Sequence, residues 1–108
     1  MDFSKEDWNL FRSKLPGWQE AYMERLNKEY IQILSSEGKA SDKFWALEKR
    51  VNQDKRSPGV IVQLRRRDMP IQLTALLRDD VIERDDLKEF SPELQEYIGF
   101  LLGGPKKR

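Results

Sequence analysis

Two pairs of adjacent carboxylates, Asp79-Asp80 and Asp85-Asp86, come nearest to the pattern of a metal site in this chain. A calcium-binding loop needs oxygen ligands at fixed intervals, a glycine at its turn and a bidentate glutamate at the twelfth position. Here the spacing differs, no glycine intervenes, and Val81-Ile82 separates the two pairs. We therefore interpret the four aspartates as helix-capping acids and predict that the chain holds no metal.

Catalytic chemistry is restricted by two missing residue types. The 108 residues include no cysteine and no histidine. Their absence excludes cysteine-based metal sites, thiolate nucleophiles and catalytic triads that depend on histidine. Carboxylates, lysines and tyrosines remain for acid–base work, but these residues occur in every soluble protein. The composition therefore predicts a protein that is not an enzyme and that takes no cofactor and no small-molecule substrate.

Charge is segregated along the chain. Between Lys49 and Arg67 there are seven basic residues and one acidic residue, a net charge of +6. Between Asp79 and Glu96 there are eight acidic and two basic residues, a net charge of −6. Three interpretations are open. The segments can be solvated faces that attract one another, the basic one can hold phosphates around Arg65-Arg66-Arg67, or the acidic one can imitate a nucleic-acid backbone or dock on a basic protein surface.

Aromatic residues provide the other candidates for binding. Most of those near the N-terminus share an apolar stripe with Leu15 and Leu26, so we expect them in the core. Trp45 and Phe100 fall off the main stripes, and an exposed aromatic side chain is a good anchor for a protein partner. The candidate partner-binding residues are Arg65, Arg66, Arg67, Lys55, Arg56, Trp45, Asp79, Asp80, Asp85 and Asp86.

The stripe that runs from Trp8 to Leu34 predicts one long N-terminal helix. Its apolar residues recur at steps of three and four, which places them on one side of a helix of about 30 residues, roughly 45 Å long. Ser4 and Asp7 have the spacing of a capping box. Pro16 interrupts the pattern without changing its phase. This indicates either one kinked helix or two helices that share a face, and we favour the kink.

Further elements follow from capping residues and apolar spacing. We expect a second helix from Ser41, its N-cap, to about Lys55, with Phe44, Leu47 and Val51 on one face. Residues 60–64 are interpreted as a helical turn or a short buried segment. The remaining elements are a helix capped by Asp68 that runs through Leu77, a buried connector at Val81-Ile82, a short turn from Asp85 to Phe90, and a last helix that Ser91 caps and that Pro92 begins.

These elements predict an all-α fold, a compact bundle of four to six helices built on the long, Pro-kinked N-terminal helix. Residues 1–102 form the expected single domain. No apolar run approaches the about 20 residues that span a bilayer, and the acidic start does not resemble a signal peptide, so we predict a cytoplasmic protein with no membrane partner.

The C-terminal residues 103–108 differ in kind from the rest. Gly103-Gly104 resembles a cloning linker, and the following Pro-Lys-Lys-Arg resembles the opening of a basic nuclear-import signal. We interpret the tail as a possible remnant of an engineered nuclear-localisation signal. If that is its origin, the expected location is the nucleus, and the tail is left out of fold reasoning.

Several segments resemble a small, uncharacterised family of helical proteins from Gram-positive gut bacteria and their mobile elements, sometimes labelled multidrug transporters. The segments that carry the resemblance are residues 3–8 (FSKEDW), 18–23 (WQEAYM), 41–45 (SDKFW), 85–87 (DDL) and 90–91 (FS). The resemblance implies a helical fold and a mobile-element setting, and it supplies no active site. In that setting, small helical proteins often bind host machinery, including as inhibitors of CRISPR nucleases.

The sequence therefore leads to two hypotheses. The first is a non-enzymatic protein-interaction module, encoded on a mobile element, that binds or inhibits a nucleic-acid-handling protein in an anti-CRISPR-like manner. The alternative is a protein that binds nucleic acid directly through the basic segment 49–67. Salt dependence separates them, because binding to phosphates weakens by orders of magnitude between about 50 and 200 mM salt.

Overall fold

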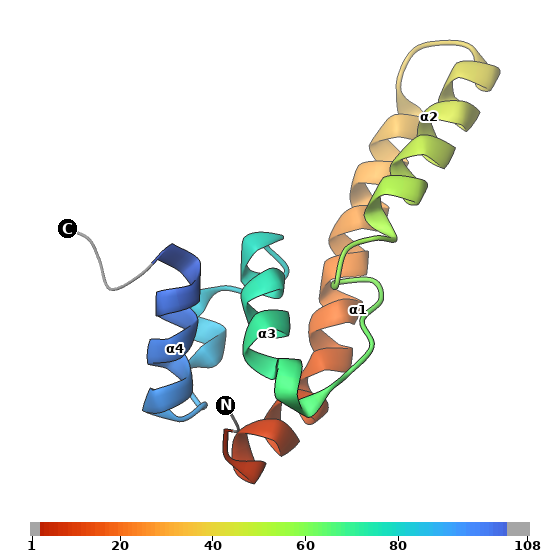
Figure 1. Cartoon of the computed structure of the whole chain (residues 1–108). Coiled ribbons are helices and arrows are strands. Elements are labelled where there is room, and N and C mark those ends of the chain that lie inside the picture. The colour runs from red at the N-terminus through yellow and green to blue at the C-terminus, as the bar shows by residue number, and fades with distance from the viewer. Residues whose placement is uncertain (1–2, 104–108) are drawn as a thin grey trace.

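The computed structural model describes residues 3–103, and this part of the chain contains helices and no strand (Figure 1). Its elements are α1 (Lys5–Ser35), α2 (Ala40–Asp54), the 3₁₀ helix η1 (Arg66–Asp68), α3 (Met69–Arg78), the 3₁₀ helix η2 (Arg84–Leu87) and α4 (Pro92–Gly103). The all-α prediction with four to six helices is confirmed. The basic tail lies outside the described residues, apart from Gly103 at the end of α4.

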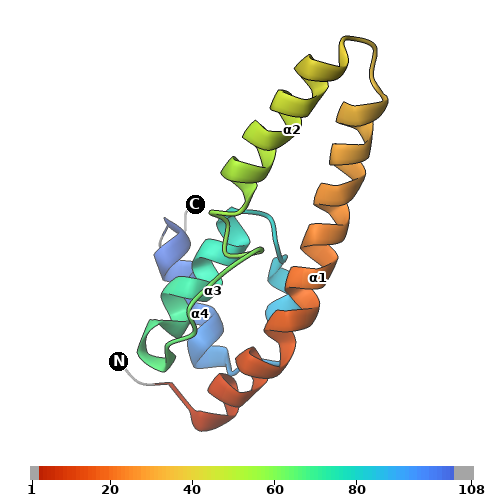
Figure 2. The same cartoon turned by 90° about the vertical axis from the view of Figure 1, so that its right-hand side faces the viewer.

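The long N-terminal helix forms as one element. α1 is unbroken from Lys5 to Ser35 and includes Pro16. Proline has no backbone N–H, so the carbonyl of Arg12 loses its helical donor and the axis can bend there. Figures 1 and 2 both show a change of direction between the red first turns and the orange remainder of α1. The kinked helix is therefore confirmed, and the alternative of two separate helices is not.

The molecule is more extended than a compact bundle. Its principal extents are 52 × 33 × 19 Å, and its radius of gyration is 16.8 Å, where a compact domain of this length has about 13 Å. Figures 1 and 2 show that α2 and the outer part of α1 form a hairpin that projects away from α3 and α4. The prediction of a compact bundle was wrong, because the outer half of the hairpin does not join the core.

The hydrophobic core lies around the N-terminal half of α1, away from the tip of the hairpin. The first half of that helix contributes Phe11 and Leu15, and the connector Val81-Ile82 is buried as predicted. The remaining buried members come from α3, η2, α4 and the turn between them: Met69, Leu73, Leu76, Leu87, Phe90, Leu94 and Ile98. α3, α4 and the base of α1 thus form a body that carries the hairpin.

The N-terminus of α1 is bonded to the N-terminus of α4. The Asp7 N–H donates to Ser4 Oγ at 3.0 Å, which is one half of the predicted capping box. The Asp7 carboxylate does not complete it. Instead it accepts the Ser91 N–H at 2.9 Å and the Ser91 hydroxyl at 2.6 Å, while Ser91 Oγ accepts the Leu94 N–H and caps α4 as expected. Asp7 is 3% exposed, so this carboxylate joins two helix starts inside the protein.

Two predicted helix caps differ from the structure. α2 begins at Ala40, so Ser41 lies inside the first turn, and the N-cap Lys39 makes no side-chain hydrogen bond. Asp68 does occupy the N-cap position of α3, but its side chain makes no capping hydrogen bond. There the 3₁₀ helix η1 leads directly into α3, so the chain is already turning before the first α-helical residue.

The segment after α2 was also predicted incorrectly. Residues 61–65 adopt no regular structure and follow a turn that ends at Val60. Val62 packs against the core, but Ile61 and Leu64 are exposed. The segment is therefore neither a helical turn nor a buried element. It is a connection that leads from the end of α2 to η1 (Figure 1).

Candidate functional site

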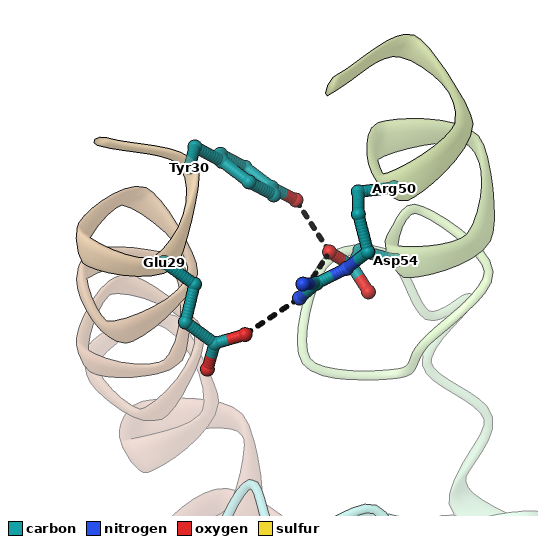
Figure 3. Close-up of polar contacts among 4 residues, drawn as sticks. All are labelled: Glu29, Tyr30, Arg50 and Asp54. Carbon is teal, nitrogen blue, oxygen red and sulfur yellow. Dashed lines mark hydrogen bonds and ion pairs between the residues drawn. The ribbon is translucent and has the colours of Figure 1, made fainter. Parts of the chain in front are cut away.

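A polar clasp joins the two helices of the hairpin (Figure 3). Its members are Glu29 and Tyr30 on α1 and Arg50 and Asp54 on α2. The Tyr30 hydroxyl donates to Asp54 Oδ2 at 2.6 Å, and Arg50 Nη2 donates to Glu29 Oε1 at 2.6 Å. The same guanidinium nitrogen lies 3.3 Å from Asp54 Oδ2. These contacts fix the register of α1 against α2.

The clasp changes the acidity of its own members. Burial raises the pKa of the Tyr30 hydroxyl to about 12, and the hydrogen bond to the Asp54 carboxylate acts in the same direction. The hydrogen bond to Glu29 raises the pKa of the Arg50 guanidinium above its ordinary value. Both groups therefore keep their protons through the physiological range, as the observed bonds require. The clasp is thus a structural contact rather than a proton-transfer site.

We expect Tyr30→Phe to lower the free energy of unfolding by about 1.5 kcal/mol, the lower end of the range for a hydrogen bond to a charged group, because the half-buried Asp54 carboxylate loses its donor. Since the folded-state pKa of Tyr30 lies above its unfolded value of about 10, the contribution is fully present below pH 10. It is lost as the pH rises toward 12. Urea unfolding at pH 8, 10 and 11.5 measures the effect. An equal wild-type-to-variant difference at all three pH values would contradict this account.

The opposite side of the hairpin is apolar and exposed. We call Ile31, Leu34, Phe44, Trp45 and Val51 the hairpin face. These side chains are 60%, 48%, 59%, 62% and 39% exposed, respectively. They come from both helices, and α2 buries none of its residues. The hairpin face is therefore a substantial apolar surface on the projecting part of the molecule.

Helical geometry places these residues together on one side. Each residue turns the helix by about 100°, and Tyr30 of α1 and Leu47 of α2 lie toward the partner helix. Glu29 and Arg50 then lie on one flank of the hairpin. Ile31, Leu34, Phe44 and Val51 lie on the other flank, with Trp45 at its outer edge. Because α1 and α2 are antiparallel, residues that are rotated in the same direction from the contact line of each helix lie on the same side of the hairpin.

Aromatic packing gives the hairpin face a defined centre. The rings of Phe44 and Trp45 meet edge to face, with centroids 4.9 Å apart and an interplanar angle of 88°. A cavity of about 210 Å³ lies nearer the base of the hairpin, between Met23, Asn27 and Tyr30 on one side and Val51 and Val60 on the other. Exposed aromatic side chains such as Phe44 and Trp45 are the residues that protein interfaces use as anchors.

The basic candidates do not form one patch. Arg65, Arg66 and Arg67 are exposed at the end of the connection that leads to α3, and the Arg66 guanidinium donates to the Phe3 carbonyl at 3.1 Å. Lys55 and Arg56 are also exposed, but they follow α2 at the other end of that connection (Figure 1). The segment of charge +6 is therefore spread along the molecule.

The acidic candidates are all exposed, and they have different local roles. Asp86 accepts the Glu83 N–H at 2.7 Å and completes a capping box at η2, so its predicted capping role is confirmed. Asp79 and Asp80 instead follow the C-terminus of α3, so they do not cap the N-terminus of a helix as we predicted. The Asp80 carbonyl accepts from Arg25 at 2.8 Å. Among residues 3–103, no three histidine, cysteine or carboxylate residues gather as metal ligands.

The two charged segments, both among the described residues, do not pair their charges, although Gly59 of the basic segment packs closely against Val81 of the acidic one. The acidic segment makes ion pairs through Glu89 with Lys14, at 2.6 Å, and through Asp85 with Lys88, at 3.6 Å. The basic segment makes ion pairs through Arg50 of the clasp. Within the described part of the chain, no ion pair joins one segment to the other. The two segments therefore keep their opposite net charges at the surface of the folded protein.

A second cavity of about 370 Å³ lies between α3 and α4. Ile71, Thr74, Arg78, Asp79 and Leu101 contribute to its lining. Arg78 already donates to the Leu101 carbonyl at 2.8 Å, and Asp79 is the one carboxylate in the lining.

In the described part of the chain no helix is both long enough and apolar enough to cross a bilayer.

Sequence reasoning identified Trp45 but missed the rest of the hairpin face. Phe44 and Val51 share the helical stripe with Leu47. Leu34 belongs to the apolar stripe of α1 that we expected to be covered, and Ile31 lies outside that stripe. Comparison with family models, with curated proteins and with solved structures finds no match for this chain. The functional proposal therefore rests on the hairpin and on the distribution of charge.

Proposed function

We propose that this chain is a non-enzymatic protein-interaction module. The hairpin face carries this proposal, because it exposes two aromatic and three aliphatic side chains on one side of a projecting hairpin. Exposed apolar patches of roughly 300–600 Å² are often functional. A nucleic-acid surface would instead gather positive charge on one face, and the basic residues here are divided between the two ends of the connection after α2.

The finer proposal concerns a foreign partner. We propose that the chain is a mobile-element product that binds or inhibits a nucleic-acid-handling protein, in an anti-CRISPR-like manner. Such proteins present basic surfaces, and the exposed acidic segment 79–96 has the complementary sign. The resemblance in residues 3–8 and 41–45 supports the mobile-element setting. Direct nucleic-acid binding through residues 49–67 is the alternative.

A binding experiment with nuclease treatment separates these proposals. The chain is immobilised in a lysate of Gram-positive gut bacteria, with and without nuclease, and retained proteins are identified by mass spectrometry. We expect a protein to be retained after nuclease treatment and to be lost with the charge reversal Glu93→Lys/Glu96→Lys. The control Glu6→Lys/Glu37→Lys reverses two exposed acids that lie outside both the acidic segment and the hairpin face, and it should keep the protein.

The alternative makes the opposite prediction. Direct binding to duplex DNA or RNA would weaken steeply between about 50 and 200 mM salt. It would also weaken when Arg65 and Arg67 are replaced by alanine. If nuclease treatment removes everything that the chain retains, and duplex binding shows this salt dependence, the protein-interaction proposal is overturned.

A further inference from the structure

We propose that the hairpin face binds a second copy of this chain, so that two hairpins form a four-helix bundle with two-fold symmetry. This inference rests on the proposed function, because it names the occupant of the same apolar surface. The hairpin is one layer of two helices, while stable helical units bury their apolar stripes between at least two layers. A second hairpin supplies the missing layer with the same residues, which is the contact that a two-fold interface requires.

The register of the hairpin gives the geometry of the pairing. The contacts Tyr30–Asp54 and Glu29–Arg50, together with the Lys43 ammonium on the Leu34 carbonyl, set which residues lie at the same height. A two-fold axis along the hairpin places α1 of one copy over α2 of the other, with the tips together. Leu34 of one copy then lies at the height of Phe44 and Trp45 of the second copy, and Ile31 lies between the heights of Phe44 and Val51.

Charges at the border of the hairpin face are compatible with this arrangement. Helical rotation places Glu20, Glu24 and Lys28 of α1, Glu48 of α2 and Lys55, which follows α2, on the same flank as the apolar residues, and all five are exposed. The border therefore carries three acidic and two basic residues. In the tips-together pairing, Glu24 lies at the height of Lys55 of the second copy, and Glu48 lies within about one turn of Lys28. Opposite charges meet at both positions.

The exposed area is sufficient for a reversible dimer. A fully buried aromatic side chain contributes about 150–250 Å², so two rings that are about three-fifths exposed leave about 200–300 Å². With the three aliphatic side chains, each copy offers roughly 400–500 Å² of apolar surface. A standard interface buries about 800 Å² per partner, so the apolar part of the hairpin face is about half of that area, and the stems of the border residues add to it. We therefore expect dissociation in the micromolar range.

Sedimentation velocity from low to high micromolar concentration tests this inference. We expect a monomer–dimer equilibrium that is little affected by salt. Phe44→Ala and Trp45→Ala should each weaken it about 30-fold or more. The control Phe100→Ala removes an aromatic side chain of the same exposure, 61%, from the body of the molecule and should leave the equilibrium unchanged. All these residues are exposed, so circular dichroism should show intact helices.

A charge exchange tests the arrangement itself. Glu48→Lys should weaken the dimer, and Lys28→Glu/Glu48→Lys should restore it, since the two positions face each other across the interface. A monomer at all concentrations, an assembly larger than a dimer, or equal loss with Phe100→Ala would overturn the inference. If the chain stays monomeric but still retains a nuclease-resistant protein from lysate, the further inference fails while the proposed function stands.

Discussion

Asp7→Ala is expected to lower the free energy of unfolding by about 3 kcal/mol. The carboxylate is buried and accepts both the backbone N–H and the hydroxyl of Ser91. Removing it leaves two donors at the start of α4 without their acceptor, and each lost hydrogen bond to a charged group costs about 1.5–3 kcal/mol. Chemical unfolding followed by far-ultraviolet circular dichroism measures the loss.

Two further variants show whether the Asp7–Ser91 bond is responsible. Glu6→Ala removes a neighbouring acid of the first turn that is exposed, so the expected loss is below about 1 kcal/mol. Ser91→Ala combined with Asp7→Ala should cost less than the sum of the single changes, because the residues share one interaction. Additive losses would show that Asp7 stabilises the fold in another way.

Gly59→Ala is expected to destabilise the protein by about 1–3 kcal/mol through steric overlap. Gly59 is buried in the turn after α2, and its N–H donates to Ser57 Oγ at 3.0 Å. A Cβ atom at this position would lie 2.7 Å from Val81 Cγ2 and inside contact distance of the Tyr22 ring. The substitution therefore forces the base of the hairpin away from the buried connector.

The matched control for Gly59→Ala has the opposite expected sign. A Cβ atom at Gly17 would meet nothing within 4 Å, and the residue lies inside α1. Gly17→Ala should therefore stabilise the protein by about 0.5–1 kcal/mol, since alanine loses less backbone entropy in a helix. Thermal or urea unfolding of the two variants measures both effects. A loss of stability at Gly17 equal to that at Gly59 would contradict the steric explanation.

Local signals predicted the elements well. Ser91 and Pro92 identified the start of α4, the three- and four-residue steps identified α1, and Val81-Ile82 was recognised as buried. These features depend on residues within a few positions of one another, so a single sequence records them. Pro16 was also interpreted correctly, because the apolar phase continues across it.

Features that depend on distant segments were not predictable in the same way. Asp7 has the spacing of a capping residue, but its carboxylate bonds to Ser91, 84 residues later. Phe44 and Val51 share a helical stripe with Leu47, yet α1 covers only one side of α2, and the rest stays exposed. Periodicity shows which residues share a face. It does not show whether another part of the chain covers that face, which is why most of the hairpin face was missed.

Site-specific photo-crosslinking tests the central claim most directly, namely that the hairpin face contacts protein. A photoreactive phenylalanine analogue replaces Trp45 in one variant and Phe100 in another, because both side chains are exposed aromatics. In living bacteria, we expect discrete protein adducts from position 45, either with a second copy or with a foreign protein, and few from position 100. Position 45 without protein adducts, or with no more than position 100, would contradict the claim.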